Sequence, residues 1–81
     1  MKFNTQRFYL REEPFGGILF DKQKDKVFAL NKTSYLICNQ LSDGRSIKQI
    51  NEFFKKKFKV NASKDVADTC TVLFEMNVVT K

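Results

Sequence analysis

The sequence predicts an α+β fold in which a three-stranded antiparallel sheet precedes three helices. The first thirty residues alternate between polar and aromatic or aliphatic side chains, the two-residue period of a strand. From Asn31 onward, apolar residues recur at three- and four-residue spacing, which is typical of helices. Eighty-one residues without an internal repeat or a long linker suffice for one domain. We therefore expect a single domain over residues 1–81.

The strands are expected at about residues 6–12, 17–21 and 26–30, where β-forming residues concentrate. Between the second and third, Lys22–Asp25 forms a polar turn, which gives an antiparallel meander. The Gly16–Gly17 pair indicates a bend or a close backbone contact. It does not suggest a nucleotide site, because neither a phosphate-loop lysine nor a helix start follows it.

The first helix is expected to begin after Asn31, a good N-cap residue, and to end at Asp43–Gly44. Tyr35, Leu36 and Leu41 are expected on one face. Ser46 is expected to cap the second helix. The apolar face of that helix is expected to contain Ile47, Ile50, Phe54 and Phe58, with lysines on the opposite face.

The third helix is expected to begin at Ser63, whose hydroxyl serves as the cap, and to continue to about Met76. Asp65 favours the positive end of the helix dipole. Val66, Cys70 and Leu73 are expected to form the buried stripe. Three strands followed by three helices resemble a winged helix-turn-helix.

Composition indicates a globular, cytoplasmic protein. Hydrophobic residues make up 42% of the chain and charged residues 30%, enough for both a core and a charged surface. No apolar stretch approaches the roughly 18 residues of a membrane span, and the N-terminus lacks the pattern of a secretory signal. Cys38 and Cys70 fall in helical patterns and are expected to be reduced core thiols.

The sequence contains no recognisable arrangement of residues for catalysis, metal binding or cofactor binding. The chain has no histidine, the commonest general base and a frequent metal ligand. Glu12 and Glu13 are neighbours on a strand and point to opposite faces. Cys38 and Cys70 match no zinc or iron–sulfur spacing. We therefore expect no enzymatic activity, no cofactor and no metal.

Several short segments resemble the PqqD-like peptide chaperones, also called recognition elements of ribosomally synthesised and post-translationally modified peptides (RiPPs). The N-terminal strands carry Arg11, Glu12 and Glu13 followed by Phe-Gly-Gly-Ile-Leu-Phe over residues 15–20. The resemblance continues through Leu30-Asn31, Asp43-Gly44 with Ile47 and Ile50, Asp65-Val66 and Val78-Val79, and so covers nearly the whole chain. The Glu-Glu-x-Phe-Gly-Gly stretch most resembles chaperones paired with radical S-adenosylmethionine maturases, the mycofactocin type among them.

Two positions depart from the family pattern. Asn77 stands where the family often has glycine, and asparagine also tolerates the left-handed conformation. Thr69 and Cys70 stand where larger apolar residues are common, which predicts looser packing of the third helix or a wider groove beside it.

The resemblance implies a leader-peptide-binding chaperone that presents a precursor peptide to a modifying enzyme, of the radical S-adenosylmethionine type. In such domains the leader adds as an antiparallel strand to the edge of the third strand and lies against the third helix. The implied edge consists of Lys26, Val27, Phe28, Ala29 and Leu30. The implied helix side consists of Asp65, Asp68, Thr69, Val72 and Met76. Taken singly, these side chains also fit ordinary roles in the core, in a strand or in a solvated helical turn.

Two alternatives remain at the level of sequence. The first is a winged-helix DNA-binding module, because the net charge is +6. Its recognition helix would carry Asp65, Asp68 and Glu75 against only Lys64, and no arginine, which disfavours nucleic acid as a partner. The second is a structural subunit that pairs its sheet edge with a second copy.

The positive charge gathers in one segment. Residues 46–59 contain five lysines and one glutamate, a net charge of +4. The cluster Lys55, Lys56, Lys57 and Lys59 fits a solvated helix end, a docking patch for an acidic surface of the modifying enzyme, or weak DNA binding that does not depend on sequence.

Overall fold

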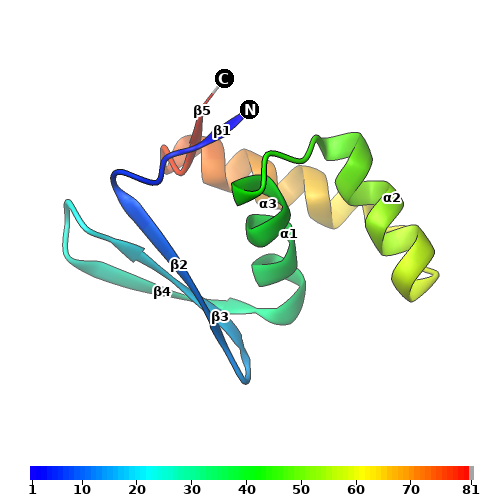
Figure 1. Ribbon diagram of the computed structural model, residues 1–81, viewed down its shortest axis with the longest axis horizontal. Helices are drawn as coiled ribbons and strands as arrows, with labels where there is room; N and C mark the ends of the chain where they lie inside the picture. The colour runs from blue at the N-terminus through cyan, green and yellow to red at the C-terminus, as the bar shows by residue number, and fades with distance from the viewer. Residues whose placement is uncertain (81) are drawn as a thin grey trace.

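The chain forms one sheet of three strands followed by three helices, as predicted. A computed structural model describes residues 1–80 (Figure 1). Strands β2 (Phe8–Glu13), β3 (Gly16–Asp21) and β4 (Lys26–Asn31) form an antiparallel sheet in the order β2-β3-β4. Helices α1 (Lys32–Ser42), α2 (Ile47–Phe58) and α3 (Ser63–Glu75) follow. The predicted α+β fold is thereby confirmed.

A second, two-stranded sheet joins the beginning and the end of the described chain. Strand β1 (Lys2–Phe3) pairs antiparallel with β5 (Val79–Thr80), and the two ends lie side by side in Figure 1. The Asn4 amide donates to the Val78 carbonyl oxygen at 2.7 Å and extends the pairing. This sheet was not predicted from the sequence, because a strand of two residues carries no alternation.

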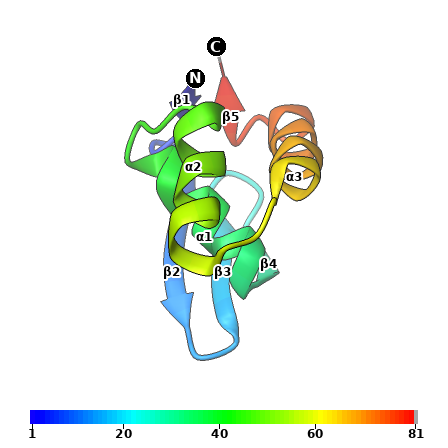
Figure 2. The same cartoon turned by 90° about the vertical axis from the view of Figure 1, so that its right-hand side faces the viewer.

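The two faces of the main sheet differ in environment. Leu19 of β3 lies opposite Leu10 of β2 and Phe28 of β4, and this row packs toward α1 and the core. The row on the other face joins Tyr9, Phe20 and Val27, of which Tyr9 and Val27 are more than half exposed. The helices therefore cover one face only, as Figure 2 shows.

The close backbone contact predicted for the glycine pair is present at Gly16, and Gly17 adds a close contact with a side chain. Gly16 has a φ of +147°, a conformation that few other residues adopt, and a Cβ there would collide with the Leu30 carbonyl oxygen. A Cβ on Gly17 would collide with the Tyr35 ring. The glycine pair thus lets β4 and α1 approach the start of β3.

Two of the three predicted helix caps are present and one is wrong. The Asn31 side chain accepts from the Ser34 amide at 2.8 Å, and Ser46 forms a reciprocal capping box with Gln49. Ser63, by contrast, is the first residue inside α3 rather than its cap. The N-cap is Ala62, and the Ser63 amide donates to the Asn61 side chain at 3.1 Å. The Asn61 side chain therefore takes a role that was predicted for the Ser63 hydroxyl.

The buried faces follow the predictions unevenly. In α3 the stripe Val66, Cys70 and Leu73 is buried, as predicted. In α1 the buried residues are Ile37, Cys38 and Leu41, because Tyr35 turns toward Gly17 and Leu36 toward α2, which leaves both half-buried.

In α2, Ile50 and Phe54 are buried as predicted, whereas Ile47 and Phe58 are 38% and 45% exposed. These two residues lie at the ends of the helix, where the rest of the chain does not cover them. Both thiols are free and buried, which confirms the prediction for Cys38 and Cys70.

Candidate functional site

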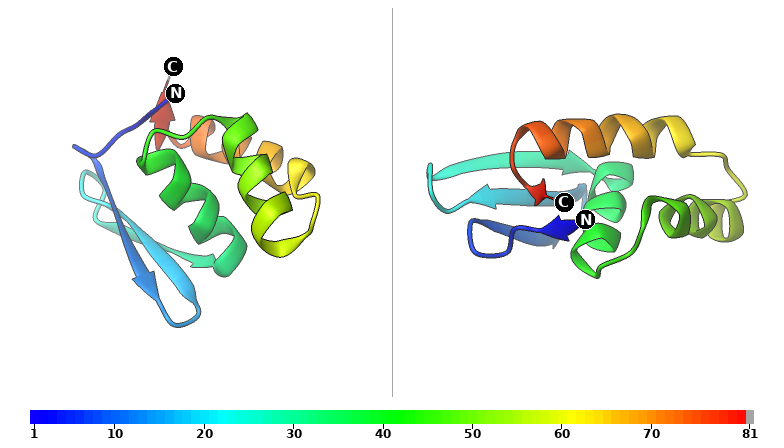
Figure 3. Two further views of the ribbon diagram at one scale, coloured as in Figure 1. Left: turned by 45° about the vertical axis from the view of Figure 1, so that its right-hand side comes forward. Right: turned by 90° about the horizontal axis from the view of Figure 1, so that it is seen from above.

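The outer edge of β4 is open along its length. No strand within residues 1–80 pairs with that edge, because β4 stands last in the order β2-β3-β4. Helix α3 runs alongside β4 rather than across it, as the right view of Figure 3 shows. The edge and the helix therefore form two walls of one surface.

The register identifies which backbone groups of β4 are free. The Lys22 amide donates to the Arg7 carbonyl oxygen at 2.8 Å, so the peptide groups of Lys22 face β2. The direction of the backbone N–H and C=O groups alternates along a strand. Asp21 and its partner Lys26 therefore point these groups toward each other, whereas the next pair, Phe20 and Val27, point theirs away from each other. Val27 and Ala29 therefore direct their N–H and C=O groups away from β3.

A groove of about 320 Å³ lies between β4 and α3. Its walls are consecutive residues of β4 and one face of α3, and its floor comes from β3, α1 and the buried side of α3. It is lined by Leu19, Phe28, Ala29, Leu30, Ser34, Cys38, Asp68, Thr69, Val72, Leu73 and Met76. Most of these side chains are apolar, so the groove offers hydrophobic area beside a free strand edge.

The floor of the groove is buried and its rim is accessible. Leu19, Cys38 and Leu73 are at most 3% exposed and belong to the hydrophobic core. Val72, on the rim, is 53% exposed. An apolar ligand side chain can therefore enter without rearrangement of the core.

The polar part of the groove lies on α3. Asp68 accepts from the Lys64 ammonium at 3.1 Å, and both side chains are mostly exposed. Exposed pairs of this kind are worth only a few tenths of a kcal/mol, about 0.3–0.5 at i,i+4 spacing. The Asp68 carboxylate is therefore available to a basic group on a ligand.

Seven of the ten predicted site residues line this groove. They are Phe28, Ala29 and Leu30 of β4 and Asp68, Thr69, Val72 and Met76 of α3. Lys26 lies beside the β3–β4 turn, in a smaller cavity that Met76 also lines. Val27 is 59% exposed on the outer face of the sheet, and only its backbone faces the edge. Asp65 lines a different pocket, between α1, the end of α2 and the start of α3.

Four residues of the groove were not predicted from the sequence. Leu19 and Leu73 occupy inward-facing positions of a strand and a helix. The hydrophobic periodicity of those elements could have indicated both residues. Ser34 and Cys38 come from α1, which crosses behind the sheet. No local pattern indicates that crossing, because it depends on tertiary packing.

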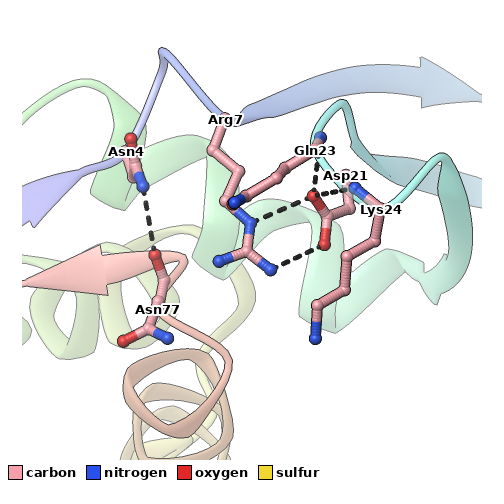
Figure 4. A network of polar contacts seen from close by, with 6 residues as sticks. All are labelled: Asn4, Arg7, Asp21, Gln23, Lys24 and Asn77. Atoms are coloured by element: carbon pink, nitrogen blue, oxygen red, sulfur yellow. Dashed lines mark hydrogen bonds and ion pairs between the residues drawn. The ribbon is translucent and has the colours of Figure 1, made fainter.

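A carboxylate holds the turn that leads into β4 (Figure 4). The Arg7 guanidinium donates to both Asp21 carboxylate oxygens, at 3.0 and 2.9 Å. The Gln23 and Lys24 amides donate to Asp21 Oδ1 at 3.0 and 3.2 Å. Hydrogen bonding from Arg7, followed by these amides, lowers the pKa of Asp21 to about 2.

The groups that could support other chemistry are few. Burial raises the pKa of the Cys38 thiol to about 12 and also raises that of Cys70, so neither is a ready nucleophile. Within the described residues no three potential metal ligands cluster together. In the same part of the chain, every helix is too short or too polar to cross a membrane.

The lysine cluster of Lys55, Lys56, Lys57 and Lys59 lies at the end of α2, and all four side chains are exposed. None of them lines the groove between β4 and α3. Lys57 Nζ lies 5.6 Å from the centre of the Phe53 ring and 5.9 Å from that of Phe58, within cation–π range.

Two solved structures are similar to this chain over nearly its whole length. One is a lasso peptide synthetase B1 complexed with the leader peptide, with 26% sequence identity and a TM-score of 0.78; the match covers 93% of this chain and 92% of that one. The other is TbiB1 in complex with the TbiA(β) leader peptide, with 17% identity and a TM-score of 0.83, over 96% and 93% of the two chains. No protein-family model and no curated protein sequence matches the chain.

Proposed function

We propose that this chain, which has the fold of the PqqD-like RiPP recognition elements, binds the leader of a ribosomally made precursor peptide and presents it to a modifying enzyme. The observation that carries the proposal is a free strand edge, at Val27 and Ala29, beside an apolar groove that is already formed. Both similar structures hold a leader peptide, which supports the same ligand class here.

The leader binds by adding an antiparallel strand to β4. The N–H and C=O groups of Val27 and Ala29 provide up to four backbone hydrogen bonds. Each net hydrogen bond contributes about 1 kcal/mol, whereas ordering each leader residue costs about 1–2 kcal/mol. Backbone pairing alone therefore gives no net affinity, and apolar contacts must supply the rest.

The groove supplies those contacts. Leader side chains at alternate positions point toward it, because side chains alternate along a strand. One apolar side chain between Phe28 and Val72, and another toward Leu30, fit the lining residues. At the rim, Asp68 favours a basic leader residue, and Asp65 extends the acidic character by one helical turn.

The protein itself carries out no reaction in this proposal and acts in the cytoplasm as one domain. The modifying enzyme is proposed to be a radical S-adenosylmethionine maturase, on the strength of the Glu12-Glu13 and Phe15–Phe20 stretch of sequence. The exposed lysine cluster at the end of α2 is proposed as its docking patch, since it lies outside the leader groove and attracts acidic surfaces.

DNA binding has less support than leader binding. The helix that would enter the major groove, α3, carries Asp65, Asp68 and Glu75, and its only cation, Lys64, is paired with Asp68. These carboxylates would meet phosphates with the wrong sign of charge.

The test is a chemical-shift titration of the isotope-labelled protein with the leader of the precursor encoded beside it. The proposal expects the largest changes at Val27, Ala29, Asp68 and Val72. Changes confined to α2, or to the exposed sheet face around Tyr9, would contradict it. Salt-sensitive shifts with duplex DNA in place of the peptide would favour the DNA-binding alternative.

A further inference from the structure

A second apolar pocket lies where the proposed leader strand would enter. It has a volume of about 370 Å³ and lies between α1, the end of α2 and the start of α3. Its lining residues are Lys32, Thr33, Leu36, Phe54, Phe58, Val60, Asn61, Ala62 and Asp65. The leader groove described above does not include any of them.

Two apolar side chains of this pocket are half exposed to solvent. Phe58 and Val60 are 45% and 46% exposed, and they form one wall with the buried Phe54. The Phe54 and Phe58 rings lie 5.8 Å apart, so the wall is largely aromatic. Such a surface favours an aromatic ligand side chain.

The pocket continues the leader groove at the end where β4 stops. Lys32 and Thr33, which line the pocket, directly follow the last residue of β4, and Ser34 already lines the groove. On α3, Asp65 lines the pocket and Asp68 lines the groove. These two positions are three residues apart, about 4.5 Å along the helix axis, so one or two extended leader residues, at about 3.3 Å each, span the gap.

The direction of the leader determines which of its residues arrive there. A strand antiparallel to β4 has its N-terminal end beside Asn31, the last residue of β4. The residues that precede the paired strand therefore pass Lys32 and reach the pocket.

We infer that the pocket formed by Leu36, Phe54, Phe58 and Val60 is a second leader subsite, which holds one aromatic side chain from the segment just upstream of the strand paired with β4. The inference rests on the proposed function and deepens it, because it adds a second anchor and fixes the direction of the leader. Without the upstream anchor, the groove alone holds the peptide more weakly.

The test compares two peptides by calorimetric titration: the leader of the precursor encoded beside this chain, and the same leader shortened to begin at the first residue that pairs with β4. The protein variants are Phe58→Ser and Val60→Glu, both at exposed positions. Ile47→Ser is the matched control, because Ile47 is also exposed on α2 but lies outside the pocket. Thermal unfolding verifies that each variant is folded.

The expected result is that the unaltered protein binds the full leader about tenfold more tightly than the shortened one, as expected for one anchoring side chain worth about 1.4 kcal/mol. Phe58→Ser and Val60→Glu should lower the affinity for the full leader to that for the shortened leader and leave the latter unchanged. Ile47→Ser should change neither.

Equal affinity for the two peptides would overturn the inference while leaving the proposed function intact. So would an equal loss for both peptides in the pocket variants, since that indicates a general effect on the fold. Failure of both peptides to bind the unaltered protein would overturn the proposed function, and the inference with it.

Discussion

Arg7 and Asp21 form a bidentate ion pair that connects the start of β2 to the turn between β3 and β4. Both bonds are 3.0 Å or shorter, and the Asp21 side chain is almost fully buried. The same carboxylate accepts from the Gln23 and Lys24 amides. One side chain therefore fixes the position at which β4, the proposed leader-binding edge, begins.

This arrangement predicts a specific loss of stability in acid. The pKa of Asp21 falls from 3.8 to about 2 on folding, so its contribution is complete above pH 4 and is lost as pH falls toward 2. Asp21→Asn should lower the melting temperature at pH 7, and the difference from the unaltered protein should shrink toward pH 2. Thermal unfolding followed by circular dichroism between pH 2 and 7 measures this.

Asp25→Asn is the control for that experiment. Asp25 lies in the same turn, is exposed, and has a positive φ of 55° that asparagine tolerates. Its replacement should leave the pH profile unchanged. If the melting temperatures of Asp21→Asn and the unaltered protein differ by a constant amount at every pH, the ionised Asp21 carboxylate does not stabilise the fold.

The strand edge gives the second prediction. Val27→Pro removes an N–H that faces away from β3, so the sheet should persist while leader affinity falls at least about tenfold. Val27→Ala keeps the N–H and trims only an exposed side chain, and it should stay within about twofold. Isothermal titration of both folded variants tests the edge, and equal affinities would exclude strand addition at this position.

The third prediction concerns the groove between β4 and α3. Val72→Arg places a long charged side chain at an exposed rim position, which should block leader binding without unfolding the domain. Thr71→Arg introduces the same side chain one residue away on α3, outside the groove, and should bind normally. A comparable loss in the two variants would mean that charge on α3, rather than obstruction of the groove, affects binding.

The fourth prediction concerns the reactivity of the two thiols. Because burial raises the pKa values of Cys38 and Cys70 and encloses both side chains, neither should react with a thiol reagent in the folded protein at pH 8. Both should react fully in denaturant. Since Cys38 also lines the leader groove, bound leader should slow any residual labelling of that thiol. Fast labelling of the native protein would show that the groove floor opens.

Local sequence patterns predicted the elements of the main sheet and the helices well. The alternation before Asn31 and the caps at Asn31 and Ser46 give signals that depend on neighbouring residues only. The β1–β5 pair was missed because its strands are two residues long and come from opposite ends of the chain. Ser63 was misplaced by one position, since Asn61 and Ala62 before it take over the helix start.

The site was predictable where it depends on strand order and helix periodicity, and not elsewhere. Phe28 to Leu30 follow from the edge position of the last strand, and Asp68, Thr69, Val72 and Met76 from one face of α3. Asp65 lies one turn nearer the N-terminus of α3 than the groove residues and lines the neighbouring pocket. Ser34 and Cys38 reach the groove only because α1 packs against the sheet, and the second pocket forms only where α1, α2 and α3 meet.

The most direct test of leader binding is isothermal titration of the unaltered protein with the leader of the precursor encoded beside it, with random duplex DNA as the control ligand. We expect peptide binding at micromolar concentration or tighter, and no comparable binding to DNA at physiological salt. Absence of peptide binding, together with DNA binding that weakens steeply as salt increases, would contradict this expectation and would leave the fold with a different function.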